Sequence, residues 1–524
     1  MRAFIHAFII TAFVGFSAAP LAWTATTGTQ TRVLRVRALG DPQTLDWNRA
    51  HTWMDGILIY NLMEGLVTVD SKLNAAPALA SKWTVSADNK TYTFHLRKDV
   101  KWSDGVQLKA ADFVNSWRRL LLPATKARYA SMLFDIEGAE AFNKDQQTDF
   151  TKVGIKALDD HTIQVKLRAA VSSWYWVPTM YATFPVRQDL IEKNPTTWDR
   201  PGHTVTLGPY TLAAYEPGRS ILLNKNPHYY GKRGNIDQIA MALVNDDATA
   251  LKLYEDGQID FLPKLPPLER KRLKNRADFR TWPELRTIHL RFNTSQNPMA
   301  SVALRRALSM SIDRSKIEKI FEKEFQPATS FVPPGMMGYS KKAGFAFNPE
   351  KAKAELKSAG IDPLKLPPLD LLTVSFDDLV ILAQFIQDEL KRNLGLTVKI
   401  HILEPKRYYS PLLNHADYAM QLNLWSADFP DADNFFSIFM SNSSLNRYAW
   451  KNSKYDDFIA QARTSSGKKA RETAYVKAQK ILLEESSATL PMFYGRISGL
   501  VRKPVQGFAP GAINWWTFKD LSLK

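Results

Sequence analysis

The chain has 524 residues, more than a single hydrophobic core usually supports, and its 45% hydrophobic and 11% aromatic content provides ample material for two or three folding units. The formal net charge of +17 would suit a nucleic-acid-binding protein in the cytosol. The absence of cysteine excludes a disulfide framework, thiol catalysis and a lipid carried on cysteine after processing.

The amino terminus is typical of a secretory signal peptide. It begins with Met1 and Arg2, continues with an apolar centre and ends in small residues, so we expect residues 1–25 to be removed. A membrane anchor would need about 20 uninterrupted apolar residues, whereas His6 and Thr11 interrupt this stretch. We therefore expect a periplasmic protein without a lipid anchor. Export removes the nucleic-acid interpretation and leaves the positive charge as a solvated surface.

In the first half of the chain, apolar periodicity and turn residues predict both strands and helices. Alternating residues predict strands at 32–39 and 163–167, and paired alternating segments predict two hairpins. Apolar residues on one helical face predict helices. The predicted hairpins and helices are, in chain order, a helix at 57–63, a hairpin of 83–85 with 92–96, a helix at 113–121 and a hairpin of 210–212 with 221–223.

In the second half, a proline-rich break at 262–267 precedes a basic run at 270–276, which we interpret as the solvated face of a helix. The next segments alternate between strand and helix periodicity. They are a strand at 288–292, helices at 304–312 and 379–390, a strand at 396–402 and a strand at 418–424. This succession predicts mixed α/β layers.

The most informative segment is 424–436, where Asp428 follows a predicted strand and lies between Trp425 and Phe429. A carboxylate partly desolvated by aromatic neighbours is costly unless a cation or several hydrogen-bond donors meet it. A free ammonium group of a ligand would do so. The alternative is an aspartate that only caps the following turn or helix.

Four further blocks of the sequence resemble the extracellular solute-binding proteins of family 5, in particular their oligopeptide and dipeptide branch. Proteins of this branch serve ATP-driven (ABC) peptide importers. The blocks lie at 62–66, 76–83, 93–105 and 302–314, and with the Asp428 segment they span nearly the whole mature chain. The resemblance implies an α/β fold of two lobes, of the periplasmic binding protein type, with an extra subdomain in the first lobe.

The resemblance also implies domain boundaries. Residues 26–63, 187–285 and 496–524 would form the core of lobe 1, residues 64–186 its extra subdomain, and residues 286–495 lobe 2. Strands that cross between the lobes would form a hinge, and closure would bury the ligand. Such a protein would act as a monomer.

By the same resemblance, Asp428 would hold the α-amino group of a short peptide, with Trp425, Ala427 and Phe429 around it. Tyr129 matches a position that lines the cleft in relatives. Trp53 is a further lining candidate, although packing inside the lobe fits it equally well. The remainder of the peptide would be hydrogen-bonded through its backbone like an added strand.

The group that would meet the peptide carboxylate is open. Some relatives carry a basic side chain six residues before the aspartate, whereas this chain has Leu422 there. Arg407 and Arg447 are candidates for the missing cation, and each also fits an ordinary surface arginine. The length of the peptide therefore stays open.

Catalytic motifs are absent from the sequence, which has no G-x-S-x-G, H-E-x-x-H or phosphate-loop pattern. The nine histidines are scattered, and His95 and His289 fit structural roles. We therefore expect no enzyme activity and no cofactor. The predicted function is capture of short peptides for an inner-membrane ABC permease with ATPase subunits. The alternatives are a sensor, or a carrier of another solute such as a cell-wall peptide, a nickel complex or a haem complex.

Overall fold

The computed structural model describes residues 31–410, 413, 417–446, 450–465, 467–508, 512–513 and 516–524. The predicted signal peptide and the candidate Arg447 lie outside the described residues. Within those ranges, no helix has the length and apolarity that crossing a membrane requires.

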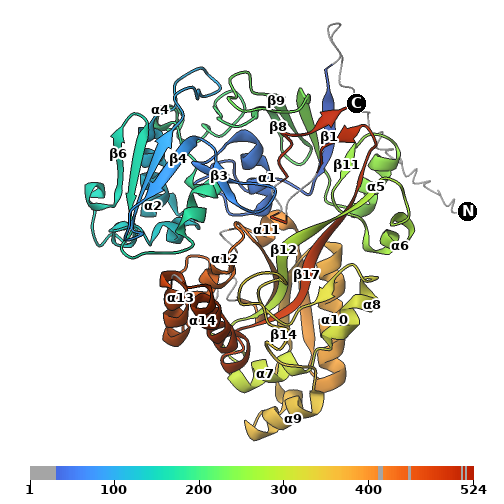
Figure 1. The fold of residues 1–524 in the computed structure, drawn as a ribbon. Helices are drawn as coiled ribbons and strands as arrows, with labels where there is room; N and C mark the ends of the chain where they lie inside the picture. Colours follow the sequence, from blue (N-terminus) through green and yellow to red (C-terminus); the bar gives the residue numbers. More distant parts are fainter. Residues whose placement is uncertain are drawn as a thin grey trace, which may run out of the picture.

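One large sheet runs through the molecule, and smaller sheets flank it (Figure 1). Its described strands follow the order β15-β14-β16-β12-β17-β11-β1-β10-β9-β8, with β13 attached to β17. Their bounds are β1 Val33–Ala38, β8 Tyr210–Glu216, β9 Ser220–Lys225, β10 Gln238–Leu243, β11 Phe261–Leu262, β12 Phe279–Phe292, β13 Gln326–Pro327, β14 Leu369–Val374, β15 Val398–Leu403, β16 Met420–Ser426 and β17 Thr489–Val501.

The smaller sheets pair strands that are close in sequence. A four-stranded sheet has the order β4-β5-β7-β6, and two further sheets have two strands each. Their bounds are β4 Ala80–Val85, β5 Thr91–Leu96, β6 Ile155–Asp159 and β7 Thr162–Lys166, then β2 Val67–Val69 with β3 Ala75–Pro77, and β18 Val505–Gln506 with β19 Ser522–Leu523.

The α-helices surround the sheets, and α2 packs against β6 and β7 of the four-stranded sheet while α10 packs against β14 and β15 of the large one. Those of the first half are α1 Trp53–Leu62, α2 Ala110–Leu121, α3 Ala139–Asn143, α4 Gln188–Lys193, α5 Asp247–Glu255 and α6 Arg270–Leu273. Those of the second half are α7 Val302–Met310, α8 Ile317–Ile320, α9 Pro349–Ser358, α10 Asp377–Leu394, α11 Pro405–Tyr408, α12 Ala432–Phe436, α13 Ser453–Thr464 and α14 Lys468–Lys480.

The molecule has two lobes, which β12 and β17 connect (Figure 1). The upper lobe in the view contains β1, β8 to β10, α1 and the four-stranded sheet, and one buried apolar cluster fills it. The lower lobe contains β14, α7 and α10 around a second cluster. The two long strands pair with each other through most of their length, with a register shift between Pro283 and Thr287. The domain boundaries expected from the sequence stay a prediction.

The local predictions from periodicity are confirmed. Strands β4 and β5 pair as the first predicted hairpin, and β8 and β9 pair as the second. Helix α2 buries Phe113 and Trp117 on its apolar face. Its first turn lacks a capping side chain at Lys109, and Asp112 compensates by accepting a hydrogen bond of 3.0 Å from the Lys109 N–H.

One edge of β16 is only partly paired. All of β16, from Met420 to Ser426, pairs with β12 on one side, while on the other side β14 pairs only with Met420 and Gln421. Among the strands of the described ranges, none pairs with residues 422–426 on that second side. The Leu422 carbonyl accepts a hydrogen bond from the Tyr408 hydroxyl and the Leu424 N–H donates to Asn423 Oδ1. The edge without a strand partner leads directly to Asp428.

The interpretation of the basic run as a solvated helix face is wrong for its first residue. Arg270 is only 6% exposed, and its guanidinium forms an ion pair of 2.7 Å with Asp378 at the start of α10. The pairing crosses from one lobe to the other. The pattern of neighbouring residues cannot reveal this ion pair, because Asp378 is 108 residues away in the chain.

Gly65 follows α1 in one of the blocks that carry the resemblance, and it packs closely against the segment from Pro178 to Phe184. A Cβ at this position would lie 2.5 Å from the Pro178 carbonyl oxygen and 2.5 Å from the Phe184 ring. Gly65→Ala should therefore lower the free energy of unfolding by about 1–3 kcal/mol, as measured by urea unfolding. Gly467→Ser is the control, because its nearest neighbour is 4.0 Å away and serine can cap α14. Equal stability of both variants would contradict this packing.

Candidate ligand-binding site

Asp428 lies in the loop between β16 and α12, and it is only 4% exposed. Asn434 holds it from two directions: its Nδ2 donates to Asp428 Oδ2 at 3.0 Å, and its Oδ1 accepts from the Asp428 N–H at 2.9 Å. The Tyr129 hydroxyl, from the other lobe, donates to Asp428 Oδ1 at 3.4 Å. The carboxylate is thus positioned by both lobes.

Burial raises the pKa of the Asp428 carboxyl to about 7, although the hydrogen bonds from Asn434 and Tyr129 lower it. The ordinary value is 3.8, and each pKa unit corresponds to about 1.4 kcal/mol. Keeping the group ionised in these surroundings therefore costs on the order of 4 kcal/mol. A cation placed next to the carboxylate would recover much of this free energy.

The pocket beside Asp428 has a volume of about 80 Å³ and is lined from both lobes. We call it the Asp428 pocket. Four of the residues predicted from the sequence line it together: Asp428, Trp425, Tyr129 and Trp53. The other lining residues that the structure describes are His51, Thr52, Tyr181, Arg291, Tyr409, Asn423, Leu424, Ser426 and Leu445.

The other predicted residues lie elsewhere. Ala427 is buried, and Phe429 is buried against Trp176, with parallel rings 6.5 Å apart. Both are next to Asp428 in the chain but are not among the residues that line its pocket. Arg407 is exposed on α11 and does not line the pocket either.

Sequence reasoning missed Arg291, which lines the Asp428 pocket from β12. It is 5% exposed, its guanidinium lies over the Phe439 ring at 5.3 Å, and it is paired in register with Gln421 of β16. Among the lining residues described, Asp428 is the one acid and Arg291 the one arginine or lysine. The available signal was a charged residue inside an apolar strand.

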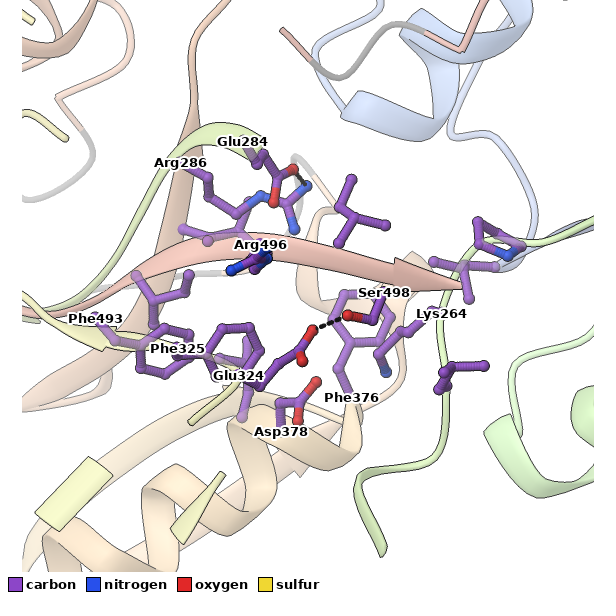
Figure 2. A pocket seen from close by; sticks show the side chains of 18 of the residues that line it. Lys264, Glu284, Arg286, Glu324, Phe325, Phe376, Asp378, Phe493, Arg496 and Ser498 are labelled. Atoms are coloured by element: carbon purple, nitrogen blue, oxygen red, sulfur yellow. Dashed lines mark hydrogen bonds and ion pairs between the residues drawn. The ribbon is translucent and has the colours of Figure 1, made fainter. Parts of the chain in front are cut away.

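A second cavity of about 100 Å³ lies where β12 and β17 pass between the lobes (Figure 2). We call it the hinge cavity. Trp53 and Leu424 line both this cavity and the Asp428 pocket, so the two spaces are neighbours. Figure 2 shows Phe325, Phe376 and Phe493 beside the carboxylates of Glu324 and Asp378.

The two lobes also contact each other away from these cavities. Arg463 of α13 forms ion pairs of 2.7 Å with Asp135 of the upper lobe and 3.0 Å with Asp433 of the lower lobe. The Ser173 hydroxyl donates to the same Asp433 carboxylate at 2.9 Å. Together with the Arg270–Asp378 pair, these contacts hold the lobes against each other.

The chain is similar to several characterised proteins over most of its length. The periplasmic oligopeptide-binding protein OppA of Escherichia coli is 31% identical, with 89% of this chain and 88% of the relative covered. The oligopeptide-binding protein OppA of Bacillus subtilis is 30% identical, with 88% and 87% covered. A third relative, YgiS of E. coli, is named a "probable deoxycholate-binding periplasmic protein". It is 29% identical, with 91% of this chain and 90% of the relative covered.

A solved structure with a bound peptide resembles this structure more than an unliganded open form does. The OppA of Haemophilus influenzae in complex with the peptide RPPGFSPFR matches with a TM-score of 0.88 at 28% identity, covering 94% of this chain and 99% of that chain. The unliganded open form of the murein tripeptide-binding protein MppA, also 28% identical, covers 94% and 97% but reaches only 0.66. The lobes here are therefore closed.

The match to a family model agrees with the relatives and with the two-lobe fold. The model describes bacterial extracellular solute-binding proteins, family 5, and it matches residues 74–447. This range is more than half of the chain. The chain therefore belongs to the bacterial extracellular solute-binding proteins of family 5.

Proposed function

We propose that this protein captures short peptides with a free amino terminus between its closed lobes and delivers them to an ABC permease. Family members are binding proteins and not enzymes, and the relatives named OppA bind oligopeptides. The observation that carries the proposal is Asp428, a carboxylate that is buried at an interlobe pocket and whose pKa is raised to about 7 by burial. An ammonium group supplies the charge that such a carboxylate needs.

The partly paired edge of β16 supports a peptide over a compact amine. Residues 423–426 of this strand line the Asp428 pocket, and the strand ends two residues before Asp428. A peptide whose amino terminus meets Asp428 would extend along this edge and form backbone hydrogen bonds with it. Such bonds give affinity without regard to side-chain identity.

Arg291 is the cation that we assign to the peptide carboxylate, in place of Arg407. It lines the same pocket as Asp428, and its register partner Gln421 precedes Ser426 by five residues, or roughly 17 Å of extended strand. An extended peptide of about four to five residues, at roughly 3.6 Å per residue at most, would span this separation. In the periplasm, with its signal peptide removed, the protein would work as a monomer with peptides and a permease as its partners.

The direct test compares free and acetylated peptides. Isothermal titration calorimetry of the wild-type protein with tri- to pentaalanine should show binding that is about tenfold to a hundredfold weaker after amino-terminal acetylation. Native mass spectrometry of the purified protein should show a bound peptide. Equal affinity for both forms, or a bound solute without a primary amine, would contradict the proposal.

The dependence of binding on pH follows from two titrating groups. Below pH 7, Asp428 takes up a proton and loses the charge that attracts an ammonium. Above a pH of about 8, the peptide α-amino group loses its own proton. Affinity for tetraalanine should therefore be highest between these values and should fall by up to about tenfold per pH unit outside them. If the affinity for tetraalanine falls only near pH 4 on the acidic side, the raised pKa of Asp428 would be contradicted.

A further inference from the structure

The hinge cavity lies beside the path that a peptide would take along β16. In the antiparallel pairing of β16 with β12, Leu424 is paired with Ile288 and Ser426 with Arg286. Leu424, Ile288 and Arg286 all line the hinge cavity, and Glu284, two residues before Arg286 on β12, lines it as well. The cavity therefore lies on the face of β12 that carries Glu284, Arg286 and Ile288, and Leu424 of β16 borders it on the same face.

An extended peptide added to this edge points successive side chains to opposite faces of the sheet. Every second side chain is consequently directed to the face that carries the hinge cavity. Since Trp53 and Leu424 separate the cavity from the Asp428 pocket while lining both, a side chain near the amino terminus is the one in reach.

The chemistry of the lining favours an apolar occupant. Large apolar side chains from both lobes and from the hinge strands surround the cavity: Leu265, Ile288, Phe325, Phe376, Leu379 and Phe493. Its volume of about 100 Å³ is of the same order as the roughly 150 Å³ of cavities that bind benzene.

The charged side chains of the lining have partners from the protein itself, Arg496 among them through a hydrogen bond of 3.0 Å to the Thr281 hydroxyl, and among the described lining residues only single atoms such as Arg270 Nη1 and Asp378 Oδ1 lack a hydrogen-bond partner. Arg270 is paired with Asp378 at 2.7 Å, and Arg286 is paired with Glu284. Lys264 is paired with Asp247 at 2.6 Å, and Ser498 donates a hydrogen bond to Glu324, which Figure 2 shows. A charged ligand side chain would have to compete with these contacts, whereas an apolar one gains from burial alone.

We propose that the hinge cavity is a specificity subsite, which receives one bulky apolar side chain, aromatic or large aliphatic, of the bound peptide. This inference rests on the proposed function, because it assumes a peptide anchored at Asp428. It makes the protein selective among short peptides and not merely receptive to any free amine.

The test is a scan of tetrapeptides by isothermal titration calorimetry on the wild-type protein. Tetraalanine is the reference, and phenylalanine replaces each alanine in turn. Phenylalanine at one position should tighten binding by about tenfold or more, as expected for a fully buried large apolar side chain. At the adjacent positions the change should stay below about threefold. Aspartate or lysine at the preferred position should bind more weakly than phenylalanine.

A cavity-filling variant assigns the preference to this cavity. Leu379→Trp should reduce the ratio of phenylalanine to alanine affinity to about one. Leu364→Trp is the matched control, because Leu364 is 79% exposed, and it should retain the wild-type ratio. If Leu379→Trp fails to fold, the wild-type scan still decides the question.

The possible outcomes separate the two proposals. If no tetrapeptide binds, tetraalanine included, the proposed function itself fails. If all bind but phenylalanine gives no gain at any position, or if aspartate or lysine binds more tightly than phenylalanine, the subsite inference alone is overturned. A gain at every position would likewise overturn it, since alternation along a strand allows no such result.

Discussion

Replacing Asp428 with asparagine is expected to weaken the binding of free-amine tetraalanine by about tenfold to a hundredfold. Asparagine retains the size and can keep a hydrogen bond with Asn434, but it lacks the charge that an ammonium requires. Amino-terminally acetylated tetraalanine should bind the variant and the wild type alike, by titration calorimetry. Equal losses for both peptides would show that Asp428 only shapes the loop.

The same variant should change stability in the opposite direction. The pKa of the Asp428 carboxyl is about 7 in the folded state, and the ordinary value is 3.8. The unfolded state therefore loses this proton first, and the free energy of unfolding falls as the pH rises between these values. Asp428→Asn should therefore melt at a higher temperature than the wild type at pH 8, without peptide, and should show little gain at pH 4. A lower melting temperature at pH 8 would contradict the desolvation of the carboxylate.

Replacing Arg463 with methionine is expected to weaken binding of every peptide, free or acetylated, by at least about tenfold. Closure of the lobes places the guanidinium between Asp135 and Asp433, both of which are buried. Without Arg463, closure would bury two carboxylates without their shared cation, and breaking such a pair costs up to about 3–5 kcal/mol. With peptide present, small-angle scattering should show a larger radius of gyration for Arg463→Met than for the wild type.

Arg168 provides the matched control for this variant. It also faces Asp135, at 3.9 Å, but its side chain is 52% exposed. Solvent screens an exposed pair, so Arg168→Met should change affinity by less than about threefold. An equal effect of the two substitutions would show that net charge, and not the buried contact between the lobes, controls closure.

Local structure was accessible from the sequence because it depends on neighbours in the chain. The period-2 pattern that ends at Leu424 and the turn-rich loop after it placed Asp428 at the end of a strand, as β16 confirms. The apolar stripe from Leu379 to Leu390 likewise predicted α10, which ends at Gly395 in the left-handed conformation. His289, expected to be structural, is fully buried and hydrogen-bonded to Thr489 at 2.7 Å.

Contacts between distant segments were not accessible in this way. Arg270 was expected in solvent but pairs across the lobes. Arg407 was one candidate for the cation that meets the peptide carboxylate, and Arg291 lines the pocket instead. A charged residue inside an apolar strand was the one local signal at Arg291, and it does not tell which pocket the side chain lines. Its place in the pocket follows from the register of β12 with β16, which joins segments about 130 residues apart.

The sequence by itself determined the family, the two-lobe fold and the carboxylate at residue 428, because signature blocks and periodicity are properties of consecutive residues. Only the tertiary structure decided that Tyr129 and Asn434 position this carboxylate, that burial raises its pKa to about 7, and that a hinge cavity adjoins its pocket. Desolvation and cavity shape depend on which distant side chains exclude water, and closure of the two lobes sets that arrangement.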